Sequence, residues 1–489
     1  MNPIFLLLAV LLPMAAGVLL FVIKLKTDRA IQAFTAVTTV VTSALTWALI
    51  LRCRADSFTL MHFTDQLAVV FRFDGLGRFF AGILATLWPI TVLYAFSYME
   101  HAQRRRIFFA FFLLSYGIAL GISMAGNLFT MYVFYELLTL ATTPLVIHTL
   151  TKKAVRAAKT YLVFSIGGAA FAFAAMIFLV SNGASGEFCL GGLLTRHPYS
   201  DPNITLIFYL LGFLGFGVKA AIFPLHVWLP RASVAPTPVT ALLHAVAVVK
   251  AGVFAVMRLT YFSFGTALLK GSWAQAAVMS VAIFTMLFGA SMAVREPHWK
   301  RRLVYSTVAN LSYILFGVTM MTEAGFAAAL LHMAFHACIK MLAFFCAGAV
   351  LCRTGRELVT QLDGLGRKMP YTFAAFTVSA FALTGIPPLN GFVSKWQLLT
   401  AAADSENPLA YVGAGILLAA ALLTAIYMLG TVRRAWFPSK QSDLSGLASV
   451  QETDWRMLVP YAILSAGVLL TGLLAQPILN AALQIAQGR

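Results

Sequence analysis

The chain has 489 residues, of which 60% are hydrophobic and only 11% are charged, and its formal net charge is +18. A soluble protein carries about 25% charged residues, so this composition excludes a soluble domain and predicts a polytopic membrane protein. The positive charge does not predict nucleic-acid binding, because the basic residues are gathered in alternate short loops between apolar segments.

Apolar runs long enough to cross a bilayer as helices follow one another along the whole chain. We predict an all-α membrane protein of about 14 transmembrane helices, with no soluble domain. After Leu479 the chain is too short for a further helix along the membrane surface. The predicted spans are residues 3–23, 30–51, 76–96, 107–125, 128–150, 160–181, 203–223, 239–260, 273–294, 303–321, 325–351, 371–400, 409–430 and 457–478.

The loops between these spans differ sharply in charge. Odd-numbered loops carry 23 Lys and Arg against 8 Asp and Glu, whereas even-numbered loops and the C-terminal tail carry 7 against 8. Basic loops stay in the cytoplasm, so the odd loops are predicted to be cytoplasmic and both termini to lie outside. The expected location is the bacterial or archaeal cell (inner) membrane. The first apolar run has no basic residue before it, which favours a membrane helix over a cleaved signal.

Two spans are predicted to be broken. Residues 224–238 contain four prolines, and residues 384–391 contain the sequence TGIPPLNG. Proline removes a backbone donor, and unwound backbone is tolerated at membrane depth only where protein or water satisfies it. Paired interruptions of this kind are typical of transporters built from inverted repeats. We therefore match spans four to eight with spans nine to thirteen, so that both broken spans fall fourth in their sets.

This matching predicts the domain organisation. An N-terminal segment of three helices occupies residues 1–106, and the first five-helix repeat occupies residues 107–260. The second repeat occupies residues 273–430, and residues 431–489 form a linker and a C-terminal helix. Helices seven and twelve are the discontinuous ones.

Five charged side chains lie well inside the apolar spans: Glu136, Lys219, Lys250, Lys340 and Lys395. A charge at the bilayer centre is expensive, so each is a candidate for an ion path. Lysine exchanges protons near neutral pH when it is buried, and a lysine next to Glu136 would keep that carboxylate ionised. The alternatives are a structural ion pair for Glu136 and snorkelling to an interface for the lysines. Arg258, close to the end of its span, is expected to snorkel and is not included.

Histidines accompany two of these lysines. His244 lies within two helical turns of Lys250, while His332, His336 and Lys340 are spaced i, i+4 and i+8 and form one helical stripe. Histidine titrates near pH 7, so these groups are candidates for a proton relay. A packing role remains the alternative for His244, and a polar helix contact for the stripe.

The histidine pair is not predicted to bind a metal, because the sequence HMAFH lacks the glutamate of HExxH and has no third ligand nearby. The five cysteines have no metal-ligand spacing, and no phosphate-binding loop or haem motif is visible. We therefore predict no cofactor.

Several of these stretches resemble a known family, the antiporter-like membrane subunits of respiratory complex I, membrane-bound hydrogenases and Mrp-type cation/proton antiporters. The resemblance covers about residues 70–435. It is carried by the segments NLFTMYVFYELLTL, VKAAIFPLHVWLPRASVAPTPVTALLHAVAVVKAG, WKRRLVYSTVANLSYIL, HMAFHACIKMLAFFCAGAV and FALTGIPPLNGFVSKWQLL. The chain departs from the family pattern at His298, where an acidic residue is usual, and at Tyr135, where tryptophan is frequent.

The resemblance implies fourteen helices and two five-helix repeats of opposite topology. It also implies that Glu136 pairs with Lys219, and that Lys250 connects through water and the His332, His336 and Lys340 group to Lys395. Such subunits hold no redox cofactor; they stack beside other membrane subunits of a larger complex in the bilayer and move H⁺, or exchange Na⁺ for H⁺.

The coupling ion and the host complex stay open. Two alternatives also remain: a stand-alone or partner transporter subunit, for example in inorganic-carbon uptake, and a redox core that handles quinone.

Overall fold

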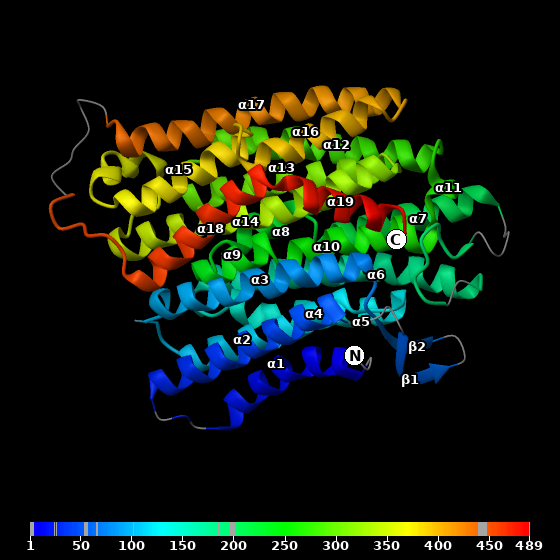
Figure 1. Ribbon diagram of the computed structural model, residues 1–489, viewed down its shortest axis with the longest axis horizontal. Coiled ribbons are helices and arrows are strands. Elements are labelled where there is room, and N and C mark those ends of the chain that lie inside the picture. Colours follow the sequence, from blue (N-terminus) through cyan, green and yellow to red (C-terminus); the bar gives the residue numbers. More distant parts are fainter. Residues whose placement is uncertain are drawn as a thin grey trace.

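The computed structural model describes residues 4–23, 25, 27–52, 57–64, 67–100, 102–183, 186–194, 201–438 and 447–488, without the side chain of His244. Its long helices run side by side between two ends of the molecule (Figure 1). Within the described residues, eleven helices are long and apolar enough to cross a membrane by length and composition. The chain is thus a multi-pass membrane protein.

Every predicted span coincides with helical segments of the structure. The helices are α1 (Ile4–Val22), α2 (Asp28–Arg52), α3 (Gly75–Tyr98), α4 (Arg105–Ser123), α5 (Leu128–Val146), α6 (Lys152–Ser181), α7 (Pro202–Gly217), α8 (Trp228–Ala232), α9 (Thr237–Ala245), α10 (Val248–Met257), α11 (Thr266–Leu269), α12 (Trp273–Arg295), α13 (Trp299–Thr319), α14 (Glu323–Thr354), α15 (Pro370–Thr384), α16 (Asn390–Ala403), α17 (Pro408–Trp436), α18 (Trp455–Leu473) and α19 (Ala475–Ala486). Short 3₁₀ turns are η2 (Leu225–Val227), η4 (Val359–Leu362) and η5 (Leu365–Arg367), and η3 (Arg258–Phe264) is a π-helix.

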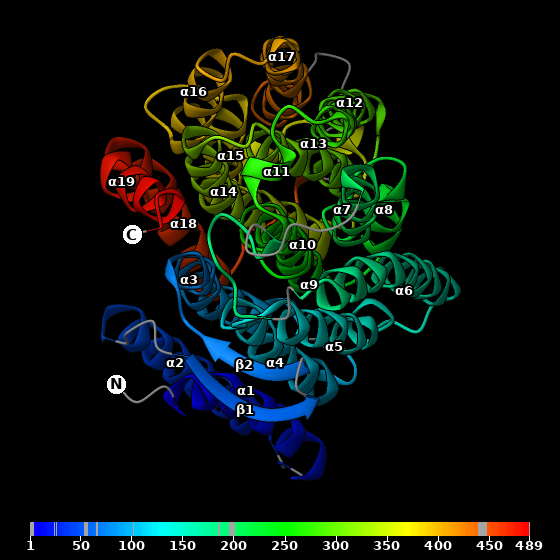
Figure 2. The ribbon, with the colours of Figure 1, turned by 90° about the vertical axis from the view of Figure 1, so that its right-hand side faces the viewer.

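The helices gather around α14, which contacts α9, α13, α15, α16, α18 and α19. Figure 2 shows α1 to α6 on one side of the molecule and α12 to α17, α14 included, on the other, with α9 and α10 between the two groups. The 32 residues of α14 include His332, His336 and Lys340. The predicted histidine stripe therefore lies on a helix at the centre of the fold.

Two elements were not predicted. The polar loop after α2 forms an antiparallel hairpin of β1 (Ser57–Thr64) and β2 (Leu67–Arg72). Every other regular element in the described part of the chain is helical. The chain also forms α19 after α18, so the expectation that the tail is too short for another helix is wrong. The last predicted span, 457–478, runs past Leu473, where α18 ends. The hairpin, the start of α1 and the end of α19 lie toward the same side of the molecule (Figure 1).

Both predicted helix breaks are present. The first is longer than expected: α7 ends at Gly217 and α9 begins at Thr237, with only short helical turns between them. Lys219 consequently lies in the unwound segment itself and not on a helix before it. The second break separates α15, which ends at Thr384, from α16, which begins at Asn390.

A third interruption was missed. The predicted span 239–260 is divided at Val246 and Ala247 into α9 and α10. The Ala247 amide bonds to the carbonyl of Leu242, five residues earlier, so the helix accommodates an extra residue here. Insertions of this π type often occur at functional sites.

Arg258 does not snorkel, contrary to the sequence-based expectation. Its side chain is fully buried and makes two hydrogen bonds of 2.5 and 2.6 Å to the carboxylate of Asp74, the residue before α3. The guanidinium also lies 4.7 Å from the ring centroids of both Phe188 and Phe262. Burial alone raises the pKa of Asp74, but the charge and hydrogen bonds of Arg258 outweigh it and hold that pKa below its usual value.

This pair fastens the start of α3 to the end of α10. Its contribution to stability is complete above about pH 4, the pKa of an unfolded aspartate, and is lost as the pH falls through the lower folded value. We expect Arg258→Met to lower the free energy of unfolding by about 3–5 kcal/mol, because the Asp74 carboxylate stays buried without its cation.

A matched control exists at the surface. Arg105 bonds Asp28 at 2.6 Å, but the Asp28 side chain is 59% exposed. Asp28→Asn is expected to cost less than about 1 kcal/mol. Equilibrium unfolding in mixed micelles compares the two variants, and equal losses would contradict the role given to the buried pair.

Candidate functional site

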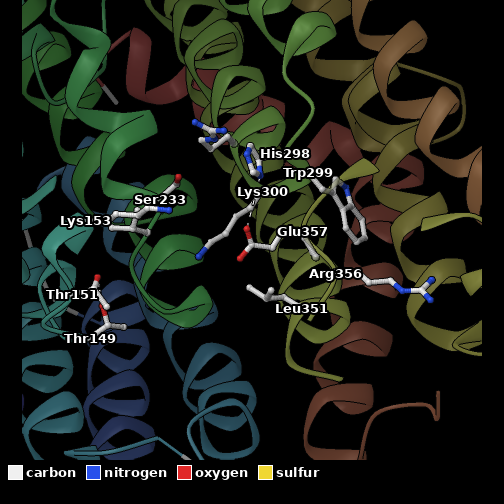
Figure 3. A pocket seen from close by; sticks show the side chains of 13 residues that line it. Thr149, Thr151, Lys153, Ser233, His298, Trp299, Lys300, Leu351, Arg356 and Glu357 are labelled. Atoms are coloured by element: carbon white, nitrogen blue, oxygen red, sulfur yellow. Dashed lines mark hydrogen bonds and ion pairs between the residues drawn. The ribbon is translucent and has the colours of Figure 1, made fainter. Parts of the chain in front are cut away.

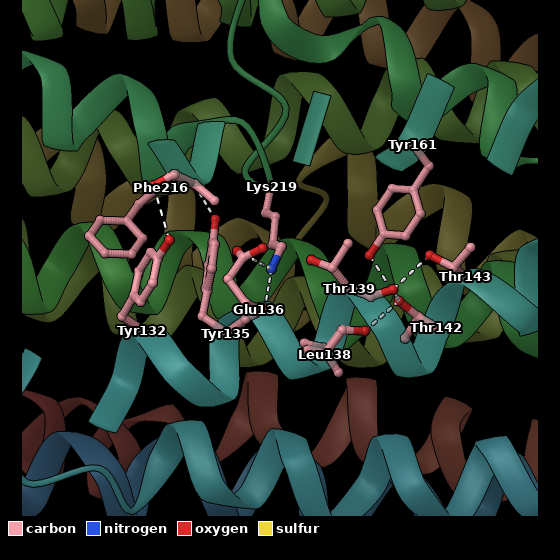
Figure 4. Close-up of polar contacts among 11 residues, drawn as sticks. Tyr132, Tyr135, Glu136, Leu138, Thr139, Thr142, Thr143, Tyr161, Phe216 and Lys219 are labelled. Carbon is pink, nitrogen blue, oxygen red and sulfur yellow. Dashed lines mark hydrogen bonds and ion pairs between the residues drawn. The ribbon is translucent and has the colours of Figure 1, made fainter. Parts of the chain in front are cut away.

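Glu136 and Lys219 form an ion pair between α5 and the first helix break. Lys219 Nζ lies 3.7 Å from Glu136 Oε1, and the lysine side chain is fully buried whereas that of Glu136 is 25% exposed. Lys219 also donates a hydrogen bond to the backbone carbonyl of Tyr135, and its ammonium lies 3.3 Å from the centroid of the Tyr135 ring (Figure 4). The contact implied by the family resemblance is therefore present.

The unwound backbone around Lys219 is satisfied by side chains. The Tyr135 hydroxyl donates to the carbonyl of Phe216 at 2.9 Å, and the Trp228 indole donates to that of Val218 at 2.8 Å. Because an unpaired backbone group costs several kcal/mol away from water, these partners make the break tolerable at membrane depth. The segment holds Lys219 at the C-terminal end of α7, the negative end of the helix dipole.

Glycine brings this segment against the next helix. A Cβ on Gly252 of α10 would lie 2.5 Å from the amide nitrogen of Ala220 and 2.9 Å from the Cβ of Lys219. No other residue fits there without a shift of the backbone. Gly252 is two positions from Lys250, so the backbone of Lys219 passes close to the helical turn that carries the next buried lysine.

Lys250 and His336 are in direct contact. Lys250 Nζ lies 2.6 Å from His336 Nδ1, and both side chains are fully buried. The lysine comes from α10 and the histidine from α14, so this hydrogen bond crosses from the middle of the molecule to its central helix. A short contact of this kind lets one proton reside on either nitrogen.

The stripe continues from His336 to His332 along α14. Their ring centroids are 5.8 Å apart with an interplanar angle of 22°, and His332 Nδ1 lies 2.9 Å from the hydroxyl oxygen of Ser394 on α16. Ser394 immediately precedes Lys395. The sequence analysis missed Ser394, although its position next to a buried lysine was a usable signal.

Lys395 lies just beyond the second break and reaches back across it. Its ammonium donates hydrogen bonds to the carbonyls of Leu383 and Thr384, the last residues of α15. These carbonyls have no intrahelical partner because the helix ends here. The ammonium is also 5.6 Å from the centroid of the Tyr313 ring. Gly385, with φ of 96°, allows the chain to turn at this point.

The structure thus joins six of the eight predicted residues into one or other of two contact groups. Glu136 and Lys219 form the first. Lys250, His336 and His332 form the second, which Lys395 joins through the ring of Tyr313. No hydrogen bond joins the two groups among the described residues. The Nε2 atoms of His332 and His336 are both buried and have no hydrogen-bond partner among the described residues. Buried polar groups are normally hydrogen-bonded, so water at these atoms would extend the second group.

The other two predicted residues are less clearly connected. Lys340 Nζ is buried and donates to the carbonyl of Leu303 on α13 at 2.9 Å, so its hydrogen bond goes to α13 and not to the Lys250–His336 pair. His244 lies on α9, before the missed interruption, and its side chain is outside the part of the chain that the structure describes. Its predicted role stays a prediction.

A cavity of about 470 Å³ opens near the ends of α6, α13 and α14 on the side of the odd-numbered loops. Lys153, His298, Lys300 and Glu357 contribute to its lining (Figure 3). Lys300 donates to the carbonyl of Ala235 at 2.6 Å and thereby faces inward. This hollow is one place where water can approach the buried groups from that side.

The chain as a whole is similar to proteins of known family. Residues 125–424 match the family model described as NADH:quinone oxidoreductase/Mrp antiporter, TM. The chain is 32% identical over 414 residues to NADH-quinone oxidoreductase subunit N of Desulforudis audaxviator, covering 81% of this chain and 80% of that protein. It is 28% identical over 413 residues to one of the Na(+)/H(+) antiporter subunits of Alkalihalophilus pseudofirmus, covering 83% and 80% respectively.

Solved structures show the same fold at lower identity. A chain of the membrane-bound sulfane sulfur reductase, an archaeal respiratory membrane complex, superimposes with a TM-score of 0.87 at 23% identity, covering 99% of this chain and 97% of that one. A chain of the Mrp complex from Dietzia sp. DQ12-45-1b gives 0.85 at 22% identity, covering 99% and 97%. The family match spans more than half of the chain, and the chain therefore belongs to the family of antiporter-like membrane subunits shared by NADH:quinone oxidoreductases and Mrp antiporters.

Proposed function

We propose that this chain is a proton-translocating, antiporter-like subunit of a multisubunit energy-converting complex in a bacterial or archaeal cell membrane. The observation that carries the proposal is the second contact group, in which Lys250, His336 and His332 follow one another and the Tyr313 ring lies between His332 and Lys395. A structural role does not require this, because a helix contact can be made with one polar pair. Buried groups that accept and release protons, aligned one after another, are typical of proton relays.

The architecture that we propose has fourteen membrane helices and two inverted five-helix repeats, with the odd loops in the cytoplasm and both termini outside. The two breaks fit this scheme, because each holds a lysine at the C-terminal end of a half-helix. The first lysine lies after α7, and the second reaches back to the end of α15. Breaks at corresponding positions, each with a lysine beside it, are expected of two halves that share an ancestor.

The two contact groups together form a row of Glu136, Lys219, Lys250, His336, His332 and Lys395. The chemistry of this row favours H⁺ over Na⁺ as the ion that it carries. Sodium, like other hard cations, is bound by oxygen ligands, whereas the linked side chains of the second group are mainly ammonium and imidazole groups. Exchange with Na⁺ in the assembled complex would need oxygen ligands elsewhere. Relatives named as Na(+)/H(+) antiporter subunits make that exchange the second candidate.

In the proposed cycle, Lys219 stores a proton and Glu136 controls how readily it leaves. In the observed arrangement the Glu136 carboxylate lies 3.7 Å from the Lys219 ammonium and stabilises its charge. When the carboxylate moves away, the buried ammonium loses its counter-charge and passes its proton toward Lys250 through water. The proton then moves along His336 and His332 to Lys395.

The first test removes the negative charge from this pair. Glu136→Gln keeps the size of the side chain but not its charge, and we expect proton flux to fall at least roughly tenfold, which corresponds to only about 1.4 kcal/mol. The co-purified complex is reconstituted in liposomes, a potassium diffusion potential drives the flux, and a pH-sensitive dye reports it. Glu323→Gln, at an exposed position in the first turn of α14, is the control.

Assembly is followed by co-purification of the neighbouring subunits and should be normal in both variants. Wild-type flux in assembled Glu136→Gln complex would rule out the proposed gate. Loss of flux in Glu323→Gln as well would show that the assay responds to any lost charge.

The second test breaks the link between Lys250 and His336. His336→Phe keeps a ring that can stack on His332 but removes the nitrogen that faces Lys250, and we expect roughly 100-fold less flux, the lower part of the range for a positioned proton carrier. His226→Phe is the matched control, because His226 is also buried, packs against Phe223 and Phe288, and lies outside the row. Equal flux in the two variants would contradict the relay.

A further inference from the structure

A stripe of polar side chains runs along α13 and was not recognised in the sequence. Arg302, Ser306, Asn310 and Tyr313 are spaced i, i+4, i+8 and i+11, which places them on one face of the helix. The last three are buried. Arg302 is only partly buried and lies in the first turn, on the side of the odd-numbered loops.

A second stripe on α17 faces the first. Thr424, Tyr427 and Thr431 are spaced i, i+3 and i+7 and are all buried. The Tyr427 hydroxyl donates to that of Ser306 at 2.6 Å and lies 3.2 Å from that of Thr424. At the outer end, Arg302 Nη1 lies 3.4 Å from the Thr431 hydroxyl.

The inner end of the two stripes meets the proposed proton row. The Tyr313 hydroxyl is buried without a hydrogen-bond partner among the described residues. The Tyr313 ring centroid is 5.4 Å from that of His332 and 5.6 Å from Lys395 Nζ. Hydroxyl contacts thus join Ser306, Tyr427 and Thr424 between Arg302 and the junction of His332 and Lys395. Water would have to complete the path on either side of these three residues, because the Thr431 hydroxyl donates to the backbone carbonyl of Tyr427.

The length of this path matches half of a membrane. Eleven residues separate Arg302 from Tyr313, and a rise of 1.5 Å per residue makes this about 16 Å. The hydrocarbon core of a bilayer is about 30 Å thick. A path that begins at the cytoplasmic end of α13 therefore reaches mid-depth at Tyr313, where the row lies.

A helix contact alone does not account for one feature of this path. Asn310 Oδ1 and His332 Nε2 are both buried without a protein partner among the described residues. Both lie near Tyr313: Asn310 is three residues before it on α13, and His332 packs against its ring from α14. Polar atoms in this condition normally bind internal water, so the inner end of the stripes is a place where water molecules can complete the chain of hydroxyls.

We propose that the facing stripes of α13 and α17 form a proton-entry path from the cytoplasmic side to the His332–Lys395 junction. This inference rests on the proposed function and adds to it a route into the second half of the protein. Each hydroxyl accepts a proton from the cytoplasmic side and releases its own toward the row, so no charge stays on Ser306, Thr424 or Tyr427. Asn310 orients the water next to Tyr313.

The test removes one hydroxyl at a time in the reconstituted complex. Tyr427→Phe and Ser306→Ala should each slow proton flux from the cytoplasmic side roughly tenfold, the effect of losing one hydrogen bond from the path. The double variant should be no slower than either single variant, since both break the same step. Lowering the pH on the cytoplasmic side should restore part of the rate, because proton entry has become limiting.

The matched control is Tyr116→Phe. Tyr116 is buried and shares a hydrogen bond of 2.8 Å with Ser43, so this variant removes the same chemical pair between α2 and α4, away from the row. Its flux should equal that of the wild type. Ser306→Ala removes a single oxygen atom and keeps the experiment informative where Tyr427→Phe fails to assemble.

Two outcomes overturn the entry path and are distinct from failure of the proposed function. Wild-type flux in both path variants, with Glu136→Gln still impaired, rejects the path and leaves the function standing. Slow flux in Glu357→Gln but not in Tyr427→Phe assigns entry to the cavity of Figure 3 instead. Wild-type flux in all of these variants, Glu136→Gln included, rejects the proposed function itself.

Discussion

The burial of lysine ammonium groups in apolar helices is the constraint on which this structure depends. A lysine at membrane depth is costly unless its hydrogen bonds are satisfied. Among the described lysines, only Lys219 has a carboxylate within 4 Å of its ammonium group. The other partners of the buried lysines are neutral: His336 for Lys250, and backbone carbonyls of Leu303 for Lys340 and of Leu383 and Thr384 for Lys395.

The helix breaks supply part of this neutral solvation. At the second break, Gly385 and the prolines that follow it end α15, and its last carbonyls turn to Lys395 instead of to a further helical turn. At the first break, the end of α7 places Lys219 beside the carbonyl of Tyr135. Neutral partners stabilise a buried ammonium less firmly than a carboxylate does. A lysine held in this way gives up its proton more readily than one in an ion pair.

The same reasoning separates two kinds of buried charge in this protein. Arg258 and Asp74 form two short hydrogen bonds inside a cage of phenylalanine rings, and arginine does not deprotonate in proteins. That pair fastens two helices together. The Glu136–Lys219 pair is longer, at 3.7 Å, and in the proposed cycle its separation changes.

Much of the site could be predicted because its signals are local in sequence. Glu136 and the buried lysines are conspicuous in apolar runs, and proline and glycine mark both breaks. The interruption at Val246 was missed because the surrounding sequence HAVAVVKAG has no proline, and tertiary packing decides the backbone there. Asp74 and Arg258 are 184 residues apart, and no local pattern predicts that they meet.

The hydroxyl stripes show the same limit. Serine, threonine and tyrosine are frequent in membrane helices, so their spacing on α13 and α17 carried little information until the two helices were seen to face each other. Likewise, Ser394 became recognisable as a part of the site only through its contact with His332.

We propose that a row of exchangeable protons, with water between Lys219 and Lys250, connects the two halves, and that Lys250 is the residue at which it crosses. Lys250→Met keeps the length of the side chain and removes its proton. The most direct measurement is the proton flux of the reconstituted complex that carries this substitution, with all subunits present. The account predicts that flux is abolished; flux at the wild-type rate would contradict it.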